Sequence, residues 1–136
     1  MATNTNRNTP APSLRLTHRS KLALRHEAPP ARAATRDVMD DLRRVLGAPA
    51  LHADAHDADI VAVIDAETLA PERWRWRVTP RRMEIAGGDA LGLAFGLYAF
   101  AERRLGVDPL WFWKDLEPAP RPWVDVPLGE TVEPPP

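Results

Sequence analysis

The chain of 136 residues has no cysteine, which excludes disulfide bonds and thiolate metal sites. It also has no excess of either charge, because 18 basic residues face 19 acidic ones. The charges are spread evenly, with nine basic and nine acidic residues up to position 68 and nine and ten after it. Neither half therefore carries the positive field that gathers nucleic acid or anionic lipid, and we expect neither a nucleic-acid partner nor a membrane partner.

Long apolar runs are missing as well. The longest nearly apolar stretch, residues 90–101, is too short to cross a bilayer and contains two glycines. Residues 1–13 are polar and lack the apolar core of a secretory signal, which leaves the cytoplasm as the default expectation. Their threonine, asparagine and proline content predicts a disordered arm.

Catalytic constellations are also lacking. Ser20 is the one serine beyond residue 13, and no convincing base lies near it, so no serine or cysteine nucleophile is predicted. The acidic residues are predicted on a helix face and in loops rather than paired across a cleft. One stretch has a metal-ligand composition but no rigid spacing, and a polar loop is the simpler interpretation. This stretch holds His52, Asp54, His56, Asp57 and Asp59. We predict no catalytic residue, metal or cofactor in the chain.

Aromatic residues are concentrated in one short segment of the chain. Residues 106–115 hold two of the five tryptophans, Trp111 and Trp113, together with Asp115. Indole rings stack on sugar faces and carboxylates accept hydroxyl protons, so these three residues are candidate substrate contacts. The alternative is a strand whose aromatic side chains pack on the preceding helix or on a neighbouring domain. Alternation along such a strand would put both tryptophans on one face.

Hydrophobic periodicity predicts alternating strands and helices. The fold class expected from them is α+β, with a mixed or antiparallel sheet and two helices packed on one face. The predicted elements are a half-buried strand or hairpin at 14–25, a helix at 35–46 capped by Thr35 and ended by Gly47, a central strand at 60–64, a hairpin of 74–78 with 83–86, and a helix at 90–105.

Two segments resemble binding motifs, one for nucleic acid and one for phosphate, but their residue patterns favour structural roles. Trp74 and Trp76 alternate with arginines, which places the rings on one face and the charges on the other, so buried tryptophans and solvated arginines are expected rather than a nucleic-acid platform. Residues 87–92 resemble a phosphate loop before a helix but lack its lysine, and Asp89 is expected to cap the helix. Gly92 and Gly96 are expected to allow close packing.

Motifs in the second half resemble a known family. Residues 85–98 are similar to Ile-x-Gly-x-Asp-x-x-Gly-x-x-Tyr-Gly-x-Tyr, and residues 106–115 to Gly-Val-x-Pro-x-x-Trp-Trp-x-Asp. Both resemble the accessory N-terminal domain of the xylan α-glucuronidases, glycoside hydrolase family 115. A helix with a similar pattern precedes them at residues 33–47. The aspartate-capped helix also resembles the domain that precedes β-hexosaminidase barrels. Phe112 and Lys114 depart from the family pattern.

Proline-rich and polar composition predicts residues 1–13 as an arm and 117–136 as a linker, on either side of an α+β domain at 14–116. The resemblance implies that this domain is accessory and that the linker leads toward a catalytic (β/α) barrel. It implies a non-catalytic domain that supports the barrel and edges its substrate cleft, with a polysaccharide or oligosaccharide as ligand. Two alternatives stay open, a free-standing carbohydrate-binding module and a protein-interaction scaffold.

Overall fold

The computed structural model describes residues 12–47, 54, 56–115 and 117–136. The predicted arm thus lies almost entirely outside the described residues. The described part of the chain forms the following elements in order: β1 (Ser13–Leu16), β2 (Leu22–Leu24), α1 (Pro29–Leu46), β3 (Ile60–Ile64), β4 (Trp74–Val78), β5 (Met83–Gly87), α2 (Ala90–Arg103), α3 (Trp111–Lys114), β6 (Val124–Pro127) and β7 (Gly129–Glu133).

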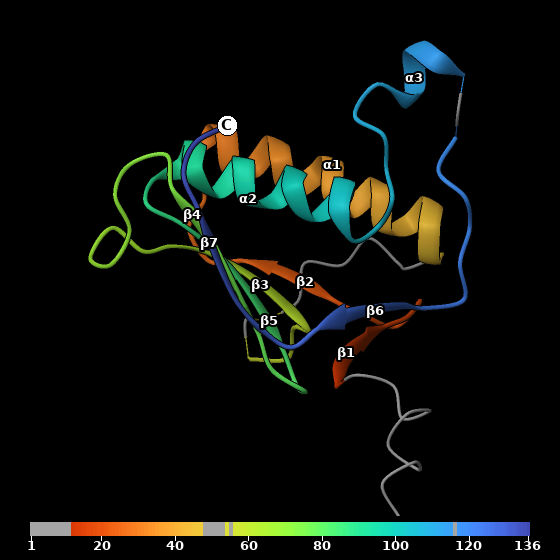
Figure 1. The fold of residues 1–136 in the computed structure, drawn as a ribbon, viewed down its shortest axis with the longest axis horizontal. Coiled ribbons are helices and arrows are strands. Elements are labelled where there is room, and N and C mark those ends of the chain that lie inside the picture. Colours follow the sequence, from red (N-terminus) through yellow and green to blue (C-terminus); the bar gives the residue numbers. More distant parts are fainter. Residues whose placement is uncertain (1–11, 48–53, 55, 116) are drawn as a thin grey trace, which may run out of the picture.

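Five strands form one mixed sheet in the order β2-β3-β5-β4-β7. The first three of these are parallel, and β4 and β7 join antiparallel. Both long helices pack on the same face of this sheet, side by side (Figure 1). The architecture is therefore α+β with two helices on one sheet face, as predicted. The strand at 60–64 lies inside the sheet between β2 and β5, and the hairpin of β4 and β5 forms where it was predicted.

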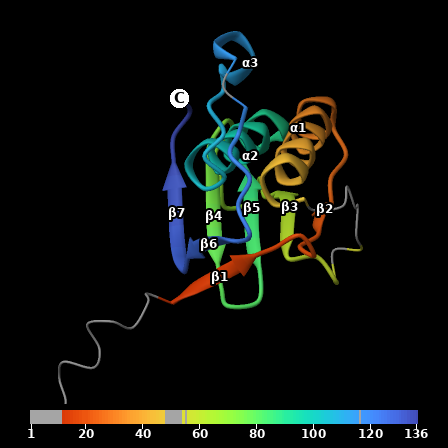
Figure 2. The same cartoon turned by 90° about the vertical axis from the view of Figure 1, so that its right-hand side faces the viewer.

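The prediction for residues 14–25 was only partly right, because its two halves enter different sheets. β1 pairs antiparallel with β6 in a two-stranded sheet at one end of the molecule, whereas β2 pairs with β3 (Figure 2). A turn between them is closed by a hydrogen bond from the Ser20 amide to the Thr17 carbonyl oxygen, 3.0 Å long. Leu14 and Leu16 of β1 join the main hydrophobic core, so the small sheet closes one end of it.

The predicted linker at 117–136 is corrected by the same pairing. Val124 and Val126 of β6 are buried, and β7 adds an edge strand to the large sheet beside β4. The alternation of Val124, Asp125 and Val126 is a strand pattern, and it buries apolar surface that a linker would leave in water. The folded unit thus extends to Glu133 rather than ending at residue 116.

Helix α1 starts earlier than its predicted range because two prolines open it. Pro29 and Pro30 occupy the first turn, where the missing amide hydrogen has no partner to lose. Thr35 was predicted to cap the helix but lies buried inside it, with its hydroxyl donating to the Ala31 carbonyl oxygen at 2.7 Å. Gly47 ends the helix in the left-handed conformation, with φ of 68°, as predicted.

Helix α2 follows its predicted start closely. The Asp89 carboxylate accepts a hydrogen bond from the Gly92 amide at 2.7 Å, which is the predicted N-cap. Gly92 lies against the backbone of Arg73, and Gly96 against Trp74 and Ile85 of the sheet, so both glycines allow the close approach that their spacing predicted. In the described part of the chain, no helix is long and apolar enough to cross a membrane.

Candidate interaction surface

The segment after α2 is folded around one side chain, Asp108. Its carboxylate accepts from the Leu110 amide at 2.8 Å and from the Lys114 ammonium group at 2.9 Å. These two contacts, the backbone one first, hold the pKa of Asp108 below its usual value. The segment therefore turns into the short helix α3 instead of the strand that alternation indicated. Asp115 ends α3 in the left-handed conformation, with φ of 55° and an exposed side chain.

The helical turn separates the two tryptophans that a strand would have put on one face. Residues two apart on a helix point to nearly opposite sides. Trp111 is half-buried against the core, and the Arg44 guanidinium lies over its ring at 5.0 Å from the centroid. Trp113 is 84% exposed. Of the three predicted contacts, Trp111 therefore lies at a packed position, while Trp113 and Asp115 lie at the surface.

A cavity of about 370 Å³ opens between α1, α2 and the segment leading into α3. Trp111 and Tyr98 contribute aromatic walls, and Ala101, Val107 and Pro109 contribute apolar ones. No sequence pattern predicted this cavity, because its walls come from three separate segments. Five charged side chains also line it, four of them acidic: Asp37, Asp40, Asp41, Glu102 and Arg44.

The acidic side chains of the cavity differ in how close their hydrogen-bond and ion-pair partners lie. The Tyr98 hydroxyl donates to Asp37 at 2.6 Å, and burial together with that carboxylate raises the pKa of Tyr98. Asp40 pairs with Arg43 at 3.2 Å, and Asp41 pairs with Arg44 at a looser 3.7 Å. Burial raises the pKa of Asp41 to about 6, against the opposing effect of Arg44.

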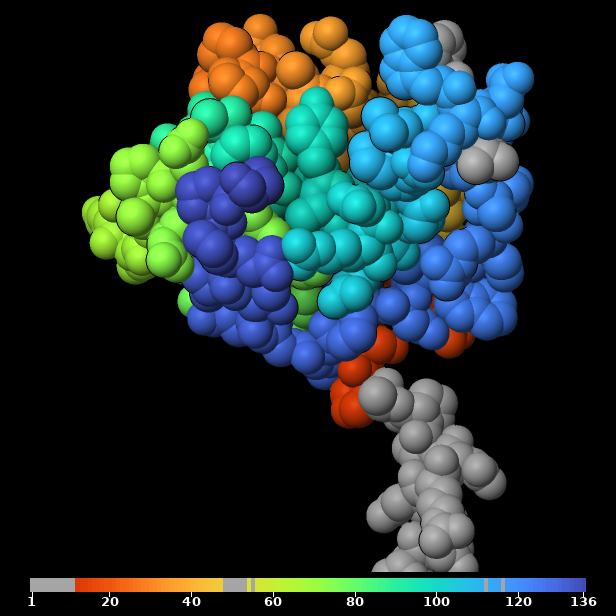
Figure 3. Space-filling model, turned by 45° about the horizontal axis from the view of Figure 1, so that its top comes forward, coloured from red at the N-terminus to blue at the C-terminus, as the bar shows by residue number. Residues whose placement is uncertain are grey.

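Beside the cavity, the outer face of α2 is apolar where a surface helix is normally polar. Leu91 and Tyr98 are 40% and 44% exposed, and Phe95 and Ala99 are half-buried between them. Their spacing places all four on one side of the helix. Figure 3 shows this part of the surface flanked by α1, the C-terminal residues and the segment around α3. Leu110 and Trp113 add further exposed apolar area at the far end.

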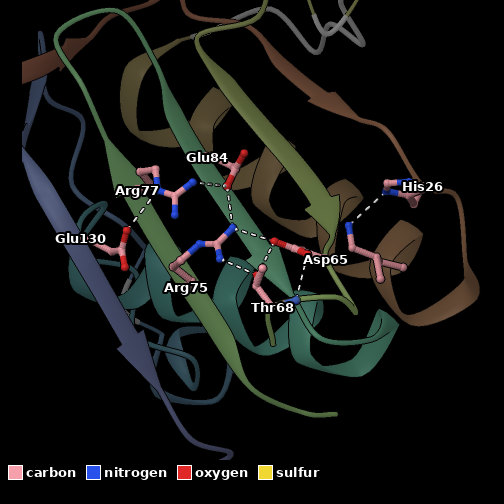
Figure 4. Close-up of polar contacts among 8 residues, drawn as sticks. His26, Asp65, Thr68, Arg75, Arg77, Glu84 and Glu130 are labelled. Carbon is pink, nitrogen blue, oxygen red and sulfur yellow. Dashed lines mark hydrogen bonds and ion pairs between the residues drawn. The ribbon is translucent and has the colours of Figure 1, made fainter. Parts of the chain in front are cut away.

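The opposite face of the sheet is different, because a network of charged side chains lies there beside a small buried apolar cluster. The Arg75 guanidinium is only 7% exposed and donates to Glu84 at 2.9 Å, to Asp65 at 3.1 Å and to Thr68 at 3.0 Å (Figure 4). The prediction of a solvated arginine was therefore wrong at this position. Arg77 remains exposed, as predicted, and pairs with Glu130 at 3.0 Å. The charged side chains on this face therefore pair with one another across neighbouring strands.

The other motifs form no site. Within the described ranges no three acidic or histidine side chains lie close enough to hold a metal ion, and His52 lies outside those ranges. Asp59 instead accepts from the Lys21 amide at 2.8 Å, which fixes the start of β3 beside β2. The glycines before α2 are filled by neighbouring backbone rather than open to a phosphate, because Gly87 abuts Leu93 and Gly88 abuts Ala70.

Comparison with known proteins yields similar structures but no match to a family model or to a curated protein sequence. A family GH115 4-O-methyl-α-glucuronidase with specificity for decorated arabinogalactans superposes with a TM-score of 0.75 at 21% identity. That match covers 88% of this chain and 18% of the glucuronidase. The N-acetyl-β-hexosaminidase of Streptomyces plicatus gives 0.68 at 19% identity, covering 91% and 23%.

The GH20 β-N-acetylhexosaminidase of Streptomyces coelicolor A3(2) matches with a TM-score of 0.68 at 18% identity. It too is matched over most of this chain, 92%, and over only 24% of its own length. The chain therefore has the fold of a part of large glycoside hydrolases and spans less than a quarter of each. The resemblance drawn from the motifs around Asp89 and Trp111 is confirmed at the level of the fold.

Proposed function

We propose that this chain is a non-catalytic accessory domain of a carbohydrate-active glycoside hydrolase, which supports a catalytic (β/α) barrel and lies beside its substrate cleft. One observation carries the proposal. Nearly the whole chain matches glycoside hydrolases of two families, yet it accounts for only 18–24% of their lengths. A unit that recurs within large enzymes of different specificity is better suited to support than to chemistry.

The surface of the chain supports the same interpretation. The outer face of α2, Leu110 and Trp113 present apolar side chains that monomeric proteins normally cover. The Arg75 cluster occupies the far sheet face, where Val132 is the one large apolar side chain exposed among the described residues, so most of the exposed apolar area lies on the helical side. We expect the barrel to pack on that side.

The main alternative within the chain itself is an active site in the cavity, because a carboxyl with a raised pKa is what a general acid requires. Glycoside hydrolysis also needs a second carboxylate across the scissile bond. Asp37, Asp40 and Asp41 all come from α1, and Asp41 is paired with Arg44, while Glu102 of α2 is exposed at the rim. We therefore expect purified residues 1–136 to hydrolyse neither an aryl glucuronide nor an aryl N-acetylhexosaminide.

The decisive experiment combines the gene and the enzyme. We expect the reading frame beyond codon 136, or an adjacent gene, to encode a (β/α) barrel. Hydrolytic activity should reside in that barrel. The melting temperature of the barrel should fall when residues 1–136 are removed. The proposal is overturned by the absence of a barrel from both places, or by turnover of residues 1–136 that Asp41→Asn abolishes.

A second candidate, a carbohydrate-binding module, is favoured by the exposure of Trp113. It predicts that glucuronoxylan fragments quench tryptophan fluorescence saturably and that Trp113→Ala removes the effect. Trp123→Ala is the matched control, because Trp123 is also exposed but lies beneath Arg15 at the small sheet. Quenching that both variants retain, or that neither the parent chain nor the variants show, excludes this candidate.

A further inference from the structure

The apolar face of α2 and the acidic cavity are neighbours. Tyr98 belongs to both, since it is exposed on the helix face and also lines the cavity. Leu110 precedes Trp111, which forms the opposite wall. A covering surface that packs on this side of the molecule therefore also closes the mouth of the cavity.

The charge of the cavity selects what enters it. Four carboxylates and one guanidinium line the walls, so the cavity is formally negative. Three of the carboxylates already contact Tyr98, Arg43 or Arg44. Among the described residues, Glu102 is in no ion pair with a basic side chain, and it is exposed at the rim. A uronic acid or another anion would be repelled, whereas a cation would gain the carboxylates of Glu102 and Asp37 and the ring of Tyr98.

The cavity already shows this chemistry on one side. The Arg44 guanidinium lies over the ring of Trp111 and pairs with Asp41. The side formed by Tyr98, Glu102 and Asp37 repeats the combination of an aromatic ring and carboxylates, but no basic side chain of the cavity wall lies among those three. Arginine is also one of the residue types, with tryptophan and tyrosine, that are enriched among the anchors at the centre of protein interfaces.

We infer that the α2 face, Leu110 and Trp113 form a protein-docking surface whose partner inserts an arginine or lysine side chain into the acidic cavity. The partner is the catalytic domain of the proposed function, and in that choice the inference rests on it. A free small cation would fill the cavity but leave Leu91 and Trp113 uncovered. A partner surface that is apolar around one basic side chain covers both.

The cavity is tested on the chain itself, with N-acetyl-arginine methylamide as the probe and N-acetyl-leucine methylamide as the neutral control. Binding is followed through the indole NH resonances of the five tryptophans. We expect the arginine derivative alone to shift the Trp111 signal saturably, with a dissociation constant in the millimolar range. Glu102→Gln should weaken binding about fivefold, the ratio that corresponds to 1 kcal/mol. Glu67→Gln, an exposed acid in the loop after β3, should not.

The docking surface is tested with the barrel and residues 1–136 as separate polypeptides. Glu102→Lys should weaken their association at least tenfold, because it places a cation where the partner's cation must lie, while Glu67→Lys should leave it unchanged. Trp113→Ala should weaken association and Trp123→Ala should not. Circular dichroism melting curves show whether each variant is folded.

The outcomes separate the two proposals. If the arginine derivative fails to bind, or if Glu102→Lys associates like the parent chain, the inference is wrong even though the barrel exists. If no barrel is encoded, the proposed function fails and the docking partner named here fails with it. Binding of the arginine derivative together with selective loss of association in Glu102→Lys supports the inference.

Discussion

The guanidinium of Arg103, in the last turn of α2, holds the carboxylate of Glu133, the last residue of β7. The two hydrogen bonds are 2.8 Å and 2.7 Å long, and the same guanidinium lies over Trp74 at 5.3 Å from the ring centroid. The hydrogen bonds between the two side chains are the main cause of two pKa shifts: they raise the pKa of Arg103 and lower that of Glu133. The pair ties the edge strand of the sheet to the helix layer.

Removing this pair should loosen β7 without unfolding the domain. Because both side chains are partly exposed, we expect a coupling free energy of only about 1 kcal/mol between Arg103→Gln and Glu133→Gln. Urea unfolding of the parent chain, both single variants and the double variant gives this value. Hydrogen exchange should accelerate in residues 129–133 before the rest of the sheet. Additive effects of the two substitutions would show that the pair is not coupled.

A chain ending at residue 116 should not fold stably, although its sequence contains both long helices and the centre of the sheet. It lacks the buried Val124 and Val126, each worth about 1.5–3 kcal/mol, and the strand that pairs with β4. This loss is comparable with the whole stability of a small domain. Circular dichroism and urea titration of residues 1–116 and 1–136 test it. A cooperative transition of equal midpoint in both chains would contradict the role given to β6 and β7.

Gly92→Ala should destabilise the domain more than Gly96→Ala. A methyl group at position 92 would collide with the backbone carbonyl of Arg73, which cannot move aside, whereas at position 96 it would meet Trp74 and Ile85 side-chain atoms at 3.1 Å. We expect losses of more than about 2 kcal/mol and about 1 kcal/mol, respectively, after the gain in helix propensity. Ala99→Gly, at a half-buried position on the outer side of α2, shows the cost of a glycine in this helix without a backbone collision. Equal stability of the two alanine variants would refute the packing argument.

Replacement of Arg75 should destabilise the far face of the sheet. Arg75→Met leaves the carboxylate of Glu84 without its closest partner, and we expect a loss of about 2–3 kcal/mol. The loss should shrink in a Glu84→Gln background, because the stranded charge is then absent. Arg77→Met is the control, since Arg77 is about half exposed and should cost less than 1 kcal/mol. Thermal melting of the four variants is sufficient.

Asp41 should make the domain more stable at mildly acidic pH. Its pKa is about 6 in the folded chain against 3.8 as the ordinary value, so the folded state binds its proton more tightly. The contribution of Asp41 to stability is therefore fully present below pH 4 and is lost as the pH rises through 6. Asp41→Asn should stabilise the domain by about 1–2 kcal/mol at pH 7.5 and little at pH 4.

The surroundings of Asp41 define the control for that experiment. Asp37 and Asp40 raise its pKa further, while Arg44 lowers it. Asp40→Asn removes one of these neighbours without removing the buried carboxyl, and should retain most of the pH dependence. Unfolding by urea between pH 4 and 8 gives the two profiles. A pH dependence that Asp41→Asn leaves unchanged would assign it to another group.

Local signals were sufficient for much of the fold. The β-branched run of β3, the hairpin of β4 and β5, the Asp89 cap and Gly47 are each specified by adjacent residues, and the structure places them as predicted. The start of α1 was missed because a pair of prolines was not recognised as a first helical turn. The burial of Arg75 was missed because its partners, Asp65 and Glu84, come from other segments.

The candidate site was less predictable than the fold for the same reason. The sequence predicted Trp111 and Trp113 as candidate contacts, but the strand expected for them depended on alternation alone. The side-chain contacts of Asp108 to Leu110 and Lys114 turn the segment into a helix instead. The cavity needs α1, α2 and the α3 segment to meet, and no spacing within one of them reveals the other two.

The pairing of β7 with β4 also has a consequence for biosynthesis. While the ribosome is still making the chain, the large sheet lacks its edge and the small sheet lacks one of its two strands, because β1 waits for β6. The two sheets can therefore both be complete only after residue 133 has emerged. Any polypeptide synthesised behind it would meet a finished surface rather than a growing one.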